Sequence, residues 1–394
     1  MSDSSLSQRS SLESLRSQSP VPSIQSEPDT LPPAVTGRMV WEGNELAPDE
    51  YVVELQKAEV ENIRAAVISF KLLGLSRSAI SKETFLLEPG LASKLSSFSS
   101  EIHDGRGVVV VRGLDGARLN DEESVIAFAG LASHVCPQRA TDSYANQTLS
   151  HIRDATHDVV PIWAKDLGLA GSKLPSAMEF HSDRFSGDVL ALYVRCDGSD
   201  AGGGEQFVSS FCRIYNELLQ VAPDVLETMA DGNWPFELKD PHRKTPYLDL
   251  GPAIFFAAGR PICQLVKAPL LGSPKIPRSP IMPSLSLEQA HALQVVEDLA
   301  RRFCTKLDRR NGDIQFINNL SIMHARSAYG GKFAQGRSPR HLLRMFLRDP
   351  RNAWTKPPSY LHKFDEPFEM GREQNLPVLD TDPWRKISGR ESHG

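Results

Sequence analysis

Residues 179–194 of the chain read EFHSDRFSGDVLALYV, and this stretch decides how the rest of the sequence is interpreted. It begins with an H-x-D triplet made by His181 and Asp183. Side chains two residues apart in an extended segment point to the same side, so both can face one metal ion. Imidazole and carboxylate together suit iron, manganese or zinc. A loop histidine hydrogen-bonded to an aspartate would give the same triplet, so the signal is weak alone.

The residues that follow and flank this triplet predict a β-rich domain. Apolar or β-branched runs predict strands at 108–111, 189–194, 206–210, 253–258, 261–266, 313–318 and 341–347. Amphipathic spacing predicts helices at 48–73, 90–102, 120–133, 211–230 (broken at Pro223) and 286–307. Helices come first and many strands follow, which favours one large β-centred domain over a doubly wound parallel sheet. Residues 137–178 lack clear periodicity, and a connection of this length is often a functional lid.

The ends of the chain differ from this central region in composition. Residues 1–35 are rich in serine and proline and poor in large apolar side chains, so we expect a disordered tail. We expect residues 36–394 to form a single domain, with a catalytic core at about 100–350. Its oligomeric state is open, and a homo-oligomer is possible.

Composition excludes several classes of protein. Among 394 residues, 44 are basic and 49 are acidic, which leaves a net charge of −5 and no basic excess to bind nucleic acid. No apolar run approaches the roughly 18 residues of a membrane-spanning helix, so no membrane partner is expected. The five cysteines are widely spaced, odd in number and without a C-x-x-C pair. This usage favours a reducing compartment, and we expect a cytoplasmic location.

A second histidine lies far along the chain, in the stretch FINNLSIMHAR at 316–326. His324 follows a strand-like run and, taken alone, would most simply be a hydrogen-bonded structural residue. Together with His181 and Asp183 it would complete a set of two histidines and one carboxylate. That set leaves three positions open on an octahedral Fe(II) ion, enough for a chelating co-substrate and oxygen.

Two arginines four residues apart, Arg340 and Arg344, form the third signal. On a strand they share one face, and their neighbours are largely apolar, which indicates burial. A buried guanidinium needs an anion, and arginine suits bidentate recognition of a carboxylate. A keto acid that chelates iron would present its far carboxylate to such a residue. A pair of surface arginines on an amphipathic strand is the plainer alternative.

The order of these motifs resembles the Fe(II)/2-oxoglutarate dioxygenases of the taurine dioxygenase and 2,4-dichlorophenoxyacetate dioxygenase (TauD/TfdA) family. The matching stretches are Phe180 to Asp183, GGEQFVSS at 203–210, INN at 317–319 with His324, and Arg340 to Arg344. The resemblance covers roughly residues 100–350 and is nearest to fungal members. It implies an α+β fold with a double-stranded β-helix (jelly roll) core and flanking helices.

The resemblance also implies roles for individual residues. His181, Asp183 and His324 would hold Fe(II), and Arg340 would bind the C5 carboxylate of the co-substrate 2-oxoglutarate. Arg344 would anchor the acidic group of a small-molecule substrate. Gln206 occupies the position of a family threonine that helps to hold 2-oxoglutarate, so this pocket departs from the family.

The implied reaction uses O2 to oxidise an aliphatic C–H bond of a small carboxylate-bearing substrate and releases succinate and CO2. Hydroxylation is the leading expectation, with desaturation or ring closure as variants, and an amino acid or natural-product precursor is the expected substrate. A catalytically inactive relative with a binding role and a zinc-dependent hydrolase that uses the same triad are the alternatives.

Several nearby residues are expected to have structural roles. Arg326 could help to position a ligand, but an ion pair behind the metal ligands is the leading expectation. His341 points away from the two arginines by strand alternation. His151 and His157 are expected at the surface. Ser182 cannot form a hydrolase triad with its two neighbours, because consecutive residues alternate sides.

Overall fold

The computed structural model describes residues 31–141, 147–160, 162, 169, 171–198, 202–238, 245–272, 277–330 and 339–380. The predicted tail at 1–35 lies outside this part up to residue 30. Val35 is described, and its backbone N–H and C=O both bond to the side-chain amide of Asn216, each at 2.8 Å. Within the described residues, no helix has both the length and the apolar composition needed to cross a membrane.

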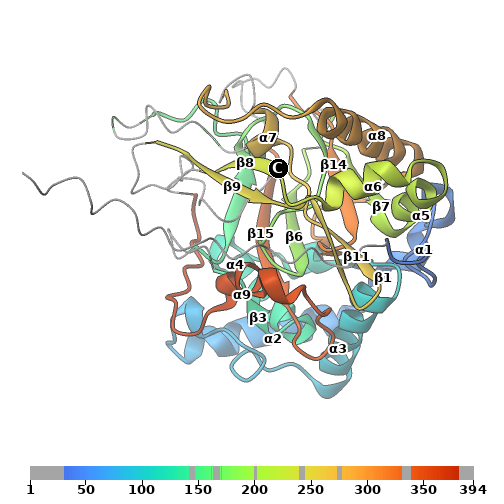
Figure 1. Ribbon diagram of the computed structural model, residues 1–394. Helices are drawn as coiled ribbons and strands as arrows, with labels where there is room; N and C mark the ends of the chain where they lie inside the picture. Colours follow the sequence, from blue (N-terminus) through green and yellow to red (C-terminus); the bar gives the residue numbers. More distant parts are fainter. Residues whose placement is uncertain are drawn as a thin grey trace, which may run out of the picture. The chain divides into compact units, whose positions relative to one another are not determined.

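The described secondary structure consists of strands in two main sheets and two hairpins, with helices around them (Figure 1). The strands are β1 (Val52–Glu54), β2 (Val108–Arg112), β3 (Gln138–Arg139), β4 (Ser150–Arg153), β5 (Met178–His181), β6 (Val189–Cys196), β7 (Gln206–Ser210), β8 (Trp234–Leu238), β9 (Tyr247–Gly251), β10 (Ile254–Ala257), β11 (Arg260–Cys263), β12 (Thr305–Lys306), β13 (Ile314–Asn318), β14 (Ile322–Arg326) and β15 (His341–Arg348). The helices are α1 (Pro48–Tyr51), α2 (Lys57–Leu72), α3 (Pro89–Asp104), α4 (Asp121–Val135), α5 (Phe211–Val221), α6 (Pro223–Ala230), α7 (Ala268–Leu271), α8 (Leu287–Phe303) and α9 (Leu361–Asp365).

The larger sheet has the strand order β1-β2-β13-β6-β15-β3, and β4 also pairs with β15. Its central strands are buried on both faces, and all five residues of β2 and of β13 are buried. A strand covered on both sides needs no polar alternation, which explains the continuous run of four valines in β2. The smaller sheet has the order β12-β7-β14-β5, with antiparallel pairing throughout.

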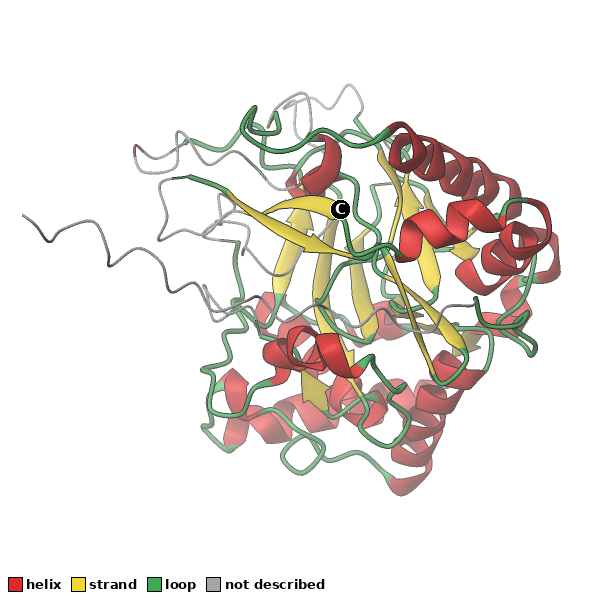
Figure 2. Cartoon of the chain, viewed as in Figure 1, coloured by secondary structure: helices red, strands yellow, loops and turns green. Residues whose placement is uncertain are grey.

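The two sheets face each other across a shared apolar core, and helices cover their outer faces (Figure 2). Alternate residues of β2, β6, β13 and β15 join the core between the sheets, where Val208 of β7 and Ile322 of β14 meet them. The other residues of those strands pack against α2, α3 and α4. Helices α5, α6 and α8 cover the smaller sheet. This arrangement is the double-stranded β-helix with flanking helices that the resemblance implied.

Two of the predicted helices differ from the structure. The helix predicted at 286–307 ends at Phe303, and Thr305–Lys306 form β12. The predicted helix at 48–73 is interrupted, because Val52 and Val53 form β1 beside β2 in parallel register. Helix α2 begins only after Gln56, where the side chain of Glu59 accepts a hydrogen bond from the Gln56 backbone N–H. Pairing with β2 therefore stabilises the β-branched residues Val52 and Val53 more than a helical conformation would.

The described part of the region at 137–178 contains strands that its weak periodicity did not predict. It contributes β3 and β4, which both pair with β15, and it ends in β5. Residues 142–146, 161, 163–168 and 170 of this region lie outside the described part. The break of the 211–230 helix at Pro223 and the pairing of the strands at 253–258 and 261–266 are confirmed by α5, α6, β10 and β11.

Candidate active site

The three predicted metal ligands meet in the smaller sheet. His181 ends β5, and His324 lies opposite it in the register between β5 and β14. The sequence placed His324 after a strand, but the residue is inside one. The two rings lie 4.2 Å apart between centroids, and Nε2 of His324 is 3.4 Å from Oδ2 of Asp183. One donor atom from each of the three residues lies within 4.8 Å of the others.

The protonation of His181 suits metal binding. Its Nδ1 lies 2.7 Å from the backbone oxygen of Glu179, and because a carbonyl can only accept, Nδ1 carries the proton. Nε2 is then left with a lone pair for a metal ion. Burial and the neighbouring His324 lower the pKa of His181 to about 3, so the ring is neutral at neutral pH.

The loop that carries Asp183 is held by one buried side chain, Asn319. Its Oδ1 accepts the Asp183 backbone N–H at 2.9 Å, and its Nδ2 donates to the backbone oxygens of Asp183 and Gly187 at 2.7 and 2.9 Å. The Asn319 backbone N–H donates to the backbone oxygen of Asp188 at 2.9 Å. One asparagine therefore fixes both ends of the loop that begins at the carboxylate ligand.

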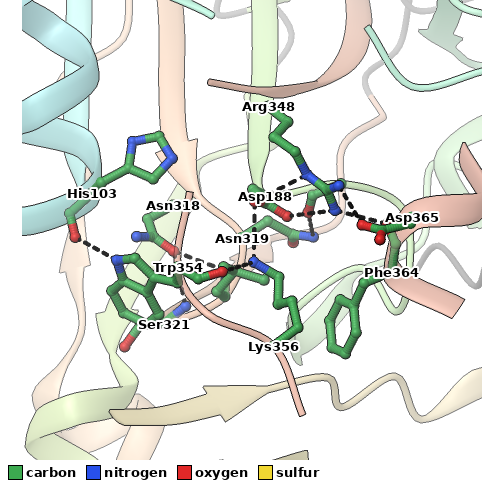
Figure 3. Close-up of polar contacts among 12 residues, drawn as sticks. His103, Asp188, Asn318, Asn319, Ser321, Arg348, Trp354, Lys356, Phe364 and Asp365 are labelled. Atoms are coloured by element: carbon green, nitrogen blue, oxygen red, sulfur yellow. Dashed lines mark hydrogen bonds and ion pairs between the residues drawn. The ribbon is translucent and has the colours of Figure 1, made fainter. Parts of the chain in front are cut away.

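A buried ion cluster secures the far end of the same loop (Figure 3). The carboxylate of Asp188 lies 3.1 Å from Nζ of Lys356 and 3.3 Å from Nε of Arg348, and its side chain is completely buried. These two cations keep the pKa of Asp188 below its usual value despite burial. Arg348 also reaches the more exposed Asp365 at 2.6 Å.

The donor set fits a divalent transition metal. Two imidazoles from the paired strands β5 and β14 and one carboxylate from the loop after β5 converge, and all three residues are buried. Carboxylate and imidazole suit Fe(II) as well as zinc, and three protein ligands leave the other positions of an octahedral ion open. The residues that the sequence selected are therefore brought together in a geometry that could hold iron.

Both predicted arginines lie beside this group. A small cavity of about 60 Å³ is lined by the three candidate ligands together with Ile152, Ser172, Met178, Leu190, Leu192, Gln206, Ala325, Arg326, Arg340, Leu342 and Arg344. Arg340 and Arg344 are 4% and 7% exposed, so they are not the surface pair of the plainer alternative. Burial and the nearby cations Arg309 and Arg326 lower the pKa of Arg340 to about 9. Arg344 interacts with the charge of Asp183.

The glycine turn before β7 packs tightly against this site. Gly203 and Gly204 have φ values of +82° and +72°, a conformation that favours glycine. A Cβ on Gly203 would lie 2.2 Å from the backbone oxygen of Ala328, and one on Gly204 would lie 3.1 Å from Nε of Arg340. Glycine lets the turn pack against the backbone of Ala328 at position 203 and against the Arg340 side chain at position 204.

Arg326 differs from its prediction, because it makes no ion pair with any described residue. Its guanidinium donates instead to the backbone oxygens of Leu174, at 2.8 Å, and of Ser176. It lies over the ring of Tyr329, 4.7 Å from the centroid, and lines the cavity. Backbone carbonyls of the segment before β5 therefore accept the hydrogen bonds that an acidic side chain would accept in an ion pair.

The remaining histidines divide between the interior and the surface. His341 points away from the arginines, as predicted, and its Nε2 lies 2.9 Å from Nδ1 of His151. His151 is only 1% exposed, so its predicted surface position is wrong. It is buried because β4 pairs with β15, a contact between residues about 190 apart in sequence. His157 is exposed, as expected.

Two contributions to the site had no clear sequence signal. Strand β4 supplies Ile152 to the cavity wall and Ser150, whose Oγ accepts from Nε of Arg344 at 3.3 Å. The INN motif pointed to Asn319 only as part of the resemblance, without its role. Ser182 donates from Oγ to the backbone oxygen of Cys263 at 2.7 Å, which agrees with its exclusion as a nucleophile.

Comparisons with known proteins agree with this geometry. The model of the family described as "Taurine catabolism dioxygenase TauD, TfdA family" matches residues 74–346. The taurine hydroxylase-like protein SAT17 of Stachybotrys chartarum is 33% identical over 355 residues, which cover 89% of each chain. FR-33289 synthase of Streptomyces rubellomurinus is 25% identical and covers 81% of this chain and 91% of its own.

Solved structures share the fold. An asparagine oxygenase bound to Fe(II), hydroxyasparagine and succinate gives a TM-score of 0.54 at 14% identity, covering 77% of this chain and 98% of its own. The non-haem iron oxygenase OrfP bound to Fe and α-ketoglutaric acid gives 0.53 at 13% identity, covering 75% and 94%. On the family match and the 33% identity, the chain belongs to the TauD/TfdA family of dioxygenases, which are non-haem iron, 2-oxoglutarate-dependent oxygenases.

Proposed function

We propose that the protein oxidises an aliphatic C–H bond of a small acidic substrate, with Fe(II), 2-oxoglutarate and O2, and releases succinate and CO2. The convergence of His181, Asp183 and His324 in a cavity walled by buried arginines carries this proposal. Hydroxylation is the expected outcome. An amino acid or a natural-product precursor is the expected substrate class, and the asparagine oxygenase and OrfP complexes, with hydroxyasparagine and hydroxyarginine, support it.

His181, Asp183 and His324 would hold the iron, which supplies the oxygen activation that no amino-acid side chain can provide. The protein's task is then to fix these ligands. The Nδ1–H of His181 is committed to Glu179, and the backbone of Asp183 is committed to Asn319. Such outer contacts orient metal ligands and raise their affinity.

Each of the two arginines would bind a different acidic ligand. Arg340, next to Gln206 on the cavity wall, would bind the C5 carboxylate of 2-oxoglutarate. Arg344 would bind the acidic group of the substrate, because it lines the same cavity as the candidate metal ligands and the resemblance gives it this role. Both guanidinium groups are buried, so an anion would offset the cost of their desolvation.

The apolar side chains of the cavity would position the reacting carbon and exclude water. Ile152, Leu190, Leu192 and Leu342 line the space between the candidate metal ligands and the arginines. A hydrocarbon segment held there would gain from burial, while its acidic group remained paired with arginine.

Anaerobic titration tests the proposal. Fe(II) and then 2-oxoglutarate are added to the wild-type protein, to His181→Ala and to His157→Ala, a matched control at an exposed histidine. Chelated 2-oxoglutarate gives a weak visible metal-to-ligand charge-transfer band. We expect the band in the wild type and in His157→Ala, and its loss in His181→Ala. A wild type without the band would contradict the proposal.

The same preparation separates the two alternatives. A zinc-dependent hydrolase would need neither 2-oxoglutarate nor Arg340, so its activity would survive omission of the keto acid. An inactive relative would show the band yet release no succinate with any of a panel of amino acids and small carboxylic acids. Succinate release that depends on one member of the panel supports the oxygenase.

A further inference from the structure

We propose that Arg326 and Gln206 bind the far carboxylate of the keto-acid co-substrate together with Arg340, and so select a dicarboxylic keto acid. This inference rests on the proposed function and extends it to a residue that lies two positions after a candidate iron ligand. It identifies the ligand of Arg326 as a carboxylate of the co-substrate, where the sequence favoured an ion pair and named no particular ligand.

Strand pairing brings the two residues together. Arg326 of β14 is the direct register partner of Gln206 of β7, and it points to the same side of its strand as His324. Arg326 is 7% exposed and Gln206 is 6% exposed, and both line the cavity that holds the candidate iron ligands. A ligand that reaches from the iron to Gln206 therefore also reaches Arg326.

Each of these side chains has a polar atom without a partner. Among the described residues, nothing hydrogen-bonds to Nε of Arg326 or to Oε1 of Gln206, although both atoms are buried. Such atoms are costly unless a ligand or water satisfies them. The amide of Gln206 can rotate to present N–H, so the pair can donate two hydrogen bonds to one carboxylate.

The positive charge of Arg326 and its neighbours also favours a bound anion. No carboxylate of the described residues lies within ion-pair distance of Arg326, and the hydrogen bonds of its guanidinium go to the neutral backbone oxygens of Leu174 and Ser176. Arg326 and Arg340 also lie against one ring, 4.7 and 4.9 Å from the centroid of Tyr329. Buried cations gathered in this way need a negative ligand between them.

The far carboxylate of the keto acid fits this place better than the acidic group of the substrate. Arg344 stands apart from the group around Tyr329, because it lies over the ring of Phe346, 5.2 Å from the centroid, and donates from Nε to Ser150. Arg326 is instead grouped with Arg340 around Tyr329. The part of the co-substrate that points away from the iron would reach this group.

The test compares two keto acids that differ only at the far end. Iron-loaded wild type, Arg326→Gln and Arg139→Gln are titrated anaerobically with 2-oxoglutarate and with 2-oxopentanoate, in which a methyl group replaces the far carboxylate. Arg139 is the matched control, since it is buried, donates to Gln374 and a backbone oxygen, and does not line the cavity. The charge-transfer band reports the dissociation constant of each complex.

We expect Arg326→Gln to weaken the binding of 2-oxoglutarate by about 10- to 100-fold, which corresponds to the loss of a hydrogen bond to a charged group. Binding of 2-oxopentanoate should change less than threefold, and Arg139→Gln should bind both acids as the wild type does. Equal weakening of both acids, or unchanged 2-oxoglutarate binding, overturns the inference. A higher KM for the primary substrate with unchanged 2-oxoglutarate binding would assign Arg326 to the substrate instead.

A second variant keeps the test decisive if Arg326→Gln does not fold. Gln206→Leu leaves the bonds from Arg326 to Leu174 and Ser176 in place, and it should also weaken 2-oxoglutarate selectively. No selective loss in Gln206→Leu contradicts the inference. If the wild type forms a band with neither keto acid, the proposed function fails before this inference is reached.

Discussion

Replacing Asn319 by alanine should loosen the candidate iron ligand Asp183 without removing any of the three candidate ligands. The change removes three side-chain hydrogen bonds of 2.7 to 2.9 Å and leaves backbone groups of Asp183 and Gly187 buried without them. At about 1 kcal/mol for each bond, the free energy of unfolding should fall by about 3 kcal/mol. Loss of an outer contact to a metal ligand typically lowers metal affinity by about 10- to 100-fold.

Asn318→Ala is the matched control for this change. Asn318 is equally buried and also makes three side-chain hydrogen bonds, to the backbone of Ile102, Leu320 and Ser321. None of them reaches the Asp183 loop. Both variants should therefore lose similar stability, but only Asn319→Ala should lose iron affinity.

Urea unfolding of the metal-free proteins measures the loss of stability. Anaerobic Fe(II) titration in the presence of 2-oxoglutarate, followed by the charge-transfer band, measures the loss of iron affinity. An iron dissociation constant that is unchanged in Asn319→Ala would refute the reasoning. So would an equal loss in both variants, because general destabilisation would then explain it. If alanine prevents folding, Asn319→Asp keeps the acceptor for the Asp183 N–H and should give an intermediate loss of affinity.

Three further predictions concern charge. Arg344→Ala should raise the KM for the acidic substrate about 10- to 100-fold while 2-oxoglutarate-dependent succinate release persists, and an unchanged KM would remove Arg344 as the anchor. Burial and a neighbouring imidazole lower the pKa of His341 from 6.5 to about 3, so the unfolded chain binds the extra proton first and stability is lost as pH falls below 6.5. The loss should reach about 2 kcal/mol at pH 5 and shrink in His341→Gln, and urea unfolding at several pH values measures both. Asp188→Asn should cost about 3–5 kcal/mol in the same assay because it leaves two buried cations, whereas Asp365→Asn, at the exposed partner of Arg348, should cost less than about 1 kcal/mol.

The sequence alone selected the candidate residues of the site. The H-x-D triplet and the two arginines have local spacings that suit metal and carboxylate binding, and the order of the motifs together with the resemblance added His324. Strand alternation also predicted correctly that His341 faces away from Arg340 and Arg344. The inferences from local spacing depend only on neighbours in the chain, and local periodicity reports them directly.

Only the tertiary structure decided which distant segments meet. The register that sets His324 opposite His181, and Arg326 opposite Gln206, depends on pairing between strands more than 100 residues apart. The same is true of β4, whose pairing with β15 buries His151 against expectation. Local periodicity tells which side of a strand a residue occupies, but the partner strand is chosen by burial and hydrogen bonding over the whole domain. For this reason the motifs indicated the candidate ligands. Only the folded chain shows the hydrogen bonds of Asn319 to the Asp183 loop and the position of Arg326 in the cavity wall.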